Sequence, residues 1–130
     1  MTNPRVTGEY VLSSEDCYYM IHPYRDNPER NLKEVMCYAR GIIHFTGGLI
    51  LVPHLMLQYL NEETQRSMIM IQCLKTVRKS DHVVVCGDTI SNGMKQEITM
   101  ADNLNKQIWH MPNPHALTIP TFALVEQWLR

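Results

Sequence analysis

Residues that can carry acid–base or nucleophilic chemistry gather directly after one apolar run of the chain. The run is residues 83–86, three valines and a cysteine, and Asp88 follows it in a short polar turn. A stretch with helical spacing comes next and carries Glu97. Ligands of parallel α/β sheets bind outside the carboxyl ends of the strands. This strand, turn and helix therefore predict a site, with Asp88 at the strand tip and Glu97 in the first turns of the helix.

The turn between these two acids has the residues of a helix start. We expect Ser91 or Asn92 at the N-cap, because their side-chain oxygens accept backbone N–H groups there. Gly93 has no side chain, so a ligand can approach the backbone closely. Ordinary strand-to-helix turns also favour these residue types. Glu97 is thus either a pocket residue or an acid favoured by the helix dipole, and Asp88 either contacts a ligand or only shapes the turn.

The composition indicates one domain with a sizeable core. At 130 residues the chain can bury about two thirds of its unfolded surface. It has 12 Lys+Arg and 13 Asp+Glu and no concentrated basic run, so we expect no nucleic-acid partner. No apolar run approaches the length of about 18 residues that a membrane span needs, and no signal-peptide pattern opens the chain. The pattern is typical of a cytoplasmic protein without a membrane partner.

Cysteine and histidine spacings give no sign of a metal site or cofactor. The four cysteines are far apart and form no CxxC pair, so we expect buried free thiols and neither zinc nor disulfides. The six histidines show no HxH or HExxH spacing. We predict no metal and no cofactor.

Strand and helix patterns alternate along the chain. Short apolar runs predict strands at 17–21, 49–52, 82–86 and 107–110. Helical spacing predicts helices from Pro28 to the Gly47-Gly48 pair, over 62–79, from the Asp88 turn to about 105, and from Pro120 onward. This order predicts an α/β fold, a three-layer Rossmann-like parallel sheet with strand order 2-1-3-4 and a C-terminal helical extension. On the first helix we expect an apolar face that packs on the sheet, made of Leu32, Val35, Met36, Ala39, Ile42 and Ile43.

The segments are expected to be residues 1–16 as an N-terminal arm, 17–111 as the α/β domain and 112–130 as the extension with a short helix. Residues 111–115 contain two prolines, so we expect no regular structure there. The helix over 62–79 is apolar on nearly every side. Such a helix is usually buried on more than one side, which predicts a homo-oligomer through it.

The predicted strand order brings three strand tips together. The first tip is His22-Pro23-Tyr24-Arg25 and the second contains His54. Tyr24 suits either ligand stacking or packing, and Arg25 is either a fork for phosphate or carboxylate or a solvated surface residue. His54 is either a ligand contact or a structural histidine. The predicted ligand-binding set is therefore His22, Tyr24, Arg25, His54, Asp88, Ser91, Asn92, Gly93 and Met94.

On these residues the chain resembles the nucleoside 2-deoxyribosyltransferase-like superfamily, and within it a small, phage-rich branch of uncharacterised domains. That branch has "SPYRG" after its first strand, an "ERN" helix start, "PHL" after the second strand and "GDRISEGMxxEI" after the third. The matching stretches here are residues 22–26, 29–31, 53–55 and 87–98. The resemblance covers about three quarters of the chain, residues 17–111.

The resemblance implies a deoxyribosyltransferase-like domain with three catalytic residues. Glu97 would attack the anomeric carbon of a deoxyribosyl group, Asp88 would bind the sugar hydroxyls or assist proton transfer, and Tyr24 would orient the nucleophile. A carboxylate can form a covalent glycosyl intermediate while a second acid protonates the leaving base. The implied ligand is a nucleoside or nucleotide, bound through its ribosyl group, with N-glycosidic transfer or hydrolysis.

The chain also departs from the branch at the implied site. His22 and Asp26 flank the Pro-Tyr pair where the branch has small residues, Thr89 replaces an arginine and Asn92 an acid. These differences would reshape the pocket. The alternative function is non-catalytic: a phage protein in the host cytoplasm that sequesters a nucleotide or ADP-ribose-type immune signal.

Overall fold

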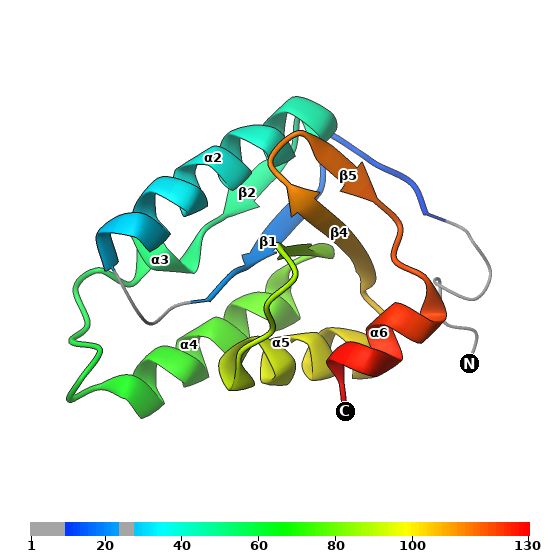
Figure 1. Ribbon diagram of the computed structural model, residues 1–130. Helices are drawn as coiled ribbons and strands as arrows, with labels where there is room; N and C mark the ends of the chain where they lie inside the picture. The colour runs from blue at the N-terminus through cyan, green and yellow to red at the C-terminus, as the bar shows by residue number, and fades with distance from the viewer. Residues whose placement is uncertain (1–9, 24–27) are drawn as a thin grey trace.

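A five-stranded sheet with helices on both faces forms the molecule, and the computed structural model describes residues 10–23 and 28–130 (Figure 1). The sheet order is β2-β1-β3-β4-β5, and the first four strands run parallel. The predicted α/β class and the 2-1-3-4 order are confirmed. The elements in chain order are β1 Cys17–Ile21, α2 Pro28–Thr46, β2 Leu49–Leu51, α3 Pro53–Met56, α4 Arg66–Lys79, β3 His82–Cys86, α5 Asn92–Asn103, β4 Gln107–Asn113, β5 Ala116–Thr118 and α6 Phe122–Trp128.

Two apolar cores lie on the two faces of the sheet, because successive side chains of a strand point to opposite faces. In β1, Tyr19 and Ile21 point into the core beneath α4, α5 and α6, while Tyr18 and Met20 point into the core beneath α2. All five residues of β3 are buried, as expected for a central parallel strand covered on both faces. The two faces of the sheet therefore bury two different sets of side chains.

The buried face of α2 differs from the predicted one. Val35, Tyr38 and Ile42 face the sheet, whereas Met36 is 43% exposed and Ile43 54% exposed. Leu32 is also partly exposed. The helix is rotated so that the Tyr38 phenol reaches the strand tips, a polar contact that a purely apolar pattern does not reveal.

The helix α4 begins at Arg66, four residues later than predicted, and buries only one side. Ile69, Cys73 and Val77 lie in the core, while Met68 and Ile71 are about half exposed. Met68 and Ile71 are thus free of the core, and the homo-oligomer through this helix stays a prediction. Of the four free cysteines, only Cys73 and Cys86 are buried and Cys37 is exposed, so the expectation of buried thiols was wrong for Cys37.

The segment after residue 110 is regular structure, so the prediction of an irregular stretch at 111–115 was wrong. β4 continues to Asn113, and β5 then pairs with it in antiparallel fashion. Pro112 is tolerated because the register shifts between His110 and Asn113, where the ladder does not need its missing N–H. The predicted last helix forms as α6, and its Trp128 packs in the same core as α4 and α5.

The part of the N-terminal segment that is described lies along the amino ends of the strands. The Asp16 carboxylate is 2.7 Å from His82 Nε2, and Trp109 Nε1 donates to His82 Nδ1 at 3.1 Å. Tyr18 stacks on the His82 ring at 4.3 Å. The Asp16 contact ties this segment to β3, and the Tyr10 ring, which meets the Trp109 ring edge to face at 4.9 Å, ties it to β4. Within the described residues no helix is long and apolar enough to cross a membrane.

Candidate functional site

Glu97 lies inside the core and not on an open surface. It comes from the second turn of α5 and is 6% exposed. The phenol of Tyr19, from the middle of β1, donates a hydrogen bond to Glu97 Oε2. Tyr19 is therefore a partner of Glu97, although it was not among the predicted site residues. Its position one residue before Met20 in an apolar strand carried no sign of this contact.

Burial dominates the electrostatics of this pair. It raises the pKa of Glu97 to about 8, although the hydrogen bond from Tyr19 acts in the opposite direction. Burial, followed by the neighbouring Glu97, raises the pKa of Tyr19 well above its ordinary value. Cys73 of α4 lies beside them, and burial raises the pKa of its thiol to about 12. At neutral pH the three groups form an uncharged cluster, the Glu97 cluster, with the acid mostly protonated.

A second polar group, at the tip of β1, gathers on the α2 side of the sheet. His22 is 5% exposed, and its Nε2 lies 3.4 Å from a carboxylate oxygen of Glu34. The Pro23 carbonyl accepts from His22 Nδ1 at 3.0 Å and from His54 Nε2 at 2.8 Å. The two imidazole rings meet edge to face, with their centroids 5.5 Å apart. His22 and His54, predicted from separate tips, are thus brought together.

His54 is held as a neutral ring. Burial lowers its pKa to about 4, and the nearby His22 lowers it further, against the opposing effect of the bond to Pro23. A neutral ring that donates from Nε2 carries its hydrogen there and keeps a lone pair on Nδ1. Since Nδ1 is itself a buried atom, His54 presents neither an exposed acceptor nor, at neutral pH, a positive charge to a ligand.

Asp88 lies at the tip of β3 as predicted, with its side chain 81% exposed. His110 of β4 donates from Nε2 to the Gly87 carbonyl at 3.0 Å and lies 3.5 Å from Asp88 Oδ1. An added Cβ at Gly87, where φ is +79°, would come within 3.5 Å of the Tyr38 hydroxyl. His110 was missed because it lies in an apolar strand. Only the pairing of β3 with β4 places it beside the tip.

The turn into α5 is as expected at one position and different at the others. Ser91 is the N-cap, and its hydroxyl accepts from the Met94 backbone N–H at 3.2 Å. Asn92 is the first helical residue and is exposed, while Gly93 is half-buried. Met94 is 1% exposed, so in this state its side chain belongs to the core, although it was predicted to bind ligand.

Replacing Ser91 by alanine should lower the free energy of unfolding by about 1 kcal/mol, because a backbone N–H of α5 loses its acceptor. Urea unfolding of the two proteins measures the difference. Asn92→Ala, one residue further and outside the cap, is the matched control and should stay within about 0.5 kcal/mol of the parent. Equal losses in both variants would contradict the assignment of Ser91 as the cap.

The predicted catalytic and binding residues Tyr24 and Arg25 lie outside the described residues. Among the residues that are described, no three His, Cys, Asp or Glu side chains come together in a way that could hold a metal ion. The described groups at the strand tips are thus hydrogen-bonding side chains: His22, Tyr38, His54, Asp88 and His110.

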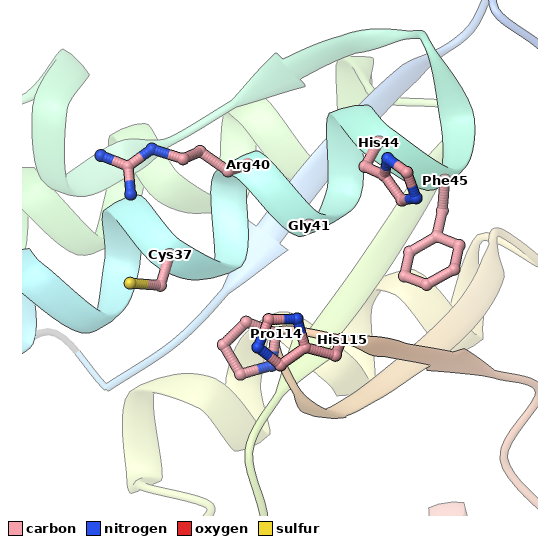
Figure 2. A pocket seen from close by; sticks show the side chains of 7 residues that line it. All are labelled: Cys37, Arg40, Gly41, His44, Phe45, Pro114 and His115. Atoms are coloured by element: carbon pink, nitrogen blue, oxygen red, sulfur yellow. The ribbon is translucent and has the colours of Figure 1, made fainter.

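One pocket lies away from the strand tips, between α2 and the turn that joins β4 to β5. Its volume is about 410 Å³, and Figure 2 shows the side chains that line it. None of its lining residues was predicted as a site residue. The lining residues are Cys37, Arg40, Gly41, His44, Phe45, Pro114 and His115.

Residues 16–111 match a family described as a domain of unknown function, DUF7768. The chain belongs to this family. The DUF7768 match runs from the residue before β1 to Met111 of β4, so it contains Tyr19, His54 and Glu97. It leaves β5 and α6 outside. Among curated proteins no sequence match was found.

Proposed function

We propose that this DUF7768 protein binds a nucleoside or nucleotide at the carboxyl ends of β1 and β3, with the ribosyl group directed toward Glu97. The buried carboxyl of Glu97 supports the proposal best. Among the described residues it is the one buried acid, and keeping a carboxyl in an apolar core costs stability that a structural role does not need. A strongly shifted pKa of a buried acid is a typical sign of a functional site.

The reaction that Glu97 would serve is cleavage or transfer of the N-glycosidic bond. The ionised carboxylate attacks the anomeric carbon, the bond to the base breaks, and the base leaves with a proton from a nearby acid. Water or a second base then displaces Glu97. In this proposal that proton comes from Asp88 or His110, which lie 3.5 Å apart at the β3 tip.

Purified protein should be incubated with nucleosides, their monophosphates and ADP-ribose derivatives, and release of free base followed by chromatography. Because only ionised Glu97 is a nucleophile, the rate should rise with pH through about 8. Glu97→Gln should abolish release, while Glu126→Gln, an exposed acid on α6, should not change it. Absence of base release from every compound between pH 6 and 9 would refute the enzymatic part.

The second candidate is sequestration of a nucleotide signal without cleavage. One observation favours it: Glu97 is buried and mostly protonated at neutral pH. In that case an ADP-ribose or nucleotide ligand should raise the melting temperature and be recovered intact after heat denaturation. A panel in which no compound raises the melting temperature would contradict both candidates.

A further inference from the structure

We propose that the pocket between α2 and the β4–β5 turn, the α2 pocket, binds a small phosphomonoester whose ester group carries a flat ring. The α2 pocket is separate from the residues of the proposed strand-tip site, with which it shares no lining side chain. Its volume of about 410 Å³ falls in the range of about 300–1,000 Å³ usual for small-molecule sites.

The two walls of the α2 pocket are held at a fixed distance. A Cβ added to Gly41 would lie 2.3 Å from the Pro114 carbonyl oxygen, so only glycine lets the turn approach the helix this closely. The Tyr38 hydroxyl reaches the Pro112 carbonyl at 3.4 Å. The turn itself is braced, since the His115 N–H donates to Asn113 Oδ1 at 2.9 Å. The cavity is therefore built into the packing of the turn on α2.

The chemistry of the lining favours an anion with an apolar part. Arg40, His44 and His115 supply N–H donors, and no acidic side chain lines the cavity. Arg40 can offer two parallel donors to phosphate oxygens. Phe45, which meets His44 edge to face at 5.3 Å, and Pro114 supply apolar surface for a ring. Figure 2 shows the helix side chains on one wall and Pro114 with His115 on the other.

The shape of the α2 pocket favours a small molecule over a nucleic-acid backbone as its ligand. A nucleic acid would need a run of basic groups along an open surface. The chain carries a net charge of −1, and the residues that bear the three donors line one cavity between a helix and a tight turn. A single phosphate on a small ring compound satisfies them.

Phenyl phosphate is a suitable probe because it lacks the ribosyl group through which the strand-tip site is proposed to bind its ligand. It is titrated at constant ionic strength into the full chain, and the Cε1–Hε1 resonances of the six histidines are followed by NMR. His44 and His115 should shift together with one affinity. His22, His54, His82 and His110, none of which lines the α2 pocket, serve as internal controls that should not move.

Arg40→Gln should weaken binding about tenfold, the usual loss for one charge-assisted contact. Lys75→Gln, which removes an exposed cation from α4 on the opposite face of the sheet, is the matched control and should bind like the parent. Unmoved His44 and His115 resonances, equal shifts in all six histidines, or unchanged affinity in Arg40→Gln would each overturn the proposal. Glu97→Gln should bind the probe normally, which separates this test from that of the strand-tip site.

Discussion

Replacing Glu97 by glutamine should remove a pH-dependent loss of stability of about 5 kcal/mol. The pKa of Glu97 is about 8 in the folded protein and about 4.5 in the unfolded chain. Below pH 4.5 both states are protonated and the acid causes no penalty. As the pH rises from about 4.5 through 8, the unfolded chain releases a proton that the folded protein retains, and the free energy of unfolding falls. Above 8 the loss is complete.

Urea unfolding at a series of pH values measures this effect. The difference between Glu97→Gln and the parent should grow from pH 4.5 to 8 and then stay constant, because glutamine still accepts from Tyr19 but does not ionise. Taking the difference cancels the other titrating groups. Glu126→Gln on the exposed side of α6 should run parallel to the parent throughout. A Glu97→Gln curve that also ran parallel would show that the carboxyl is not protonated in the core.

Replacing Trp128 by alanine should cost about 3 to 5 kcal/mol, the range for truncating a large buried aromatic side chain. Trp128 is 6% exposed, shares the core with α4 and α5, and meets the His110 ring at 5.1 Å. The loss should appear as a lower urea midpoint. It should also disturb His110 and, through it, the β3 tip.

Phe122→Ala is the control on the same helix, because Phe122 is 50% exposed. We expect it to change the free energy of unfolding by less than about 1 kcal/mol. If both variants lost the same small amount, α6 would be a loosely attached extension. If only Trp128→Ala unfolds the protein, residues beyond the family match belong to its core.

The sheet could be predicted because its central strands are identified by local sequence patterns. Residues 17–21 and 82–86 are short apolar runs bounded by polar residues, and both became strands with the expected limits. The strand order followed from the alternation with helices. The N-cap at Ser91 was predictable for the same reason, since capping depends on residues three positions apart.

The site depends on contacts that no local pattern records. Tyr19 and Glu97 are far apart in the chain, and each separately fits a core position or a helix face. His110 became a neighbour of Asp88 only through the pairing of β3 with β4. The rotation of α2 depends on Tyr38, whose hydroxyl contacts the Pro112 carbonyl, and on Gly41, which lets Pro114 approach the helix. Neither residue belongs to the apolar spacing from which the buried face was predicted.

The two edge strands of the sheet, β2 and β5, are very short, and short edge strands protect a protein against aggregation. β2 and β5 have three residues each, whereas the strands between them have five to seven. Long, flat edge strands offer free N–H and C=O groups to other chains, so short edges act as protection. A fragment cut at Met111 would uncover the edge of β4, with its apolar Ile108, Trp109 and Met111, to any neighbouring strand. By pairing with β4, the short strand β5 therefore hinders the addition of a strand from another chain at this edge.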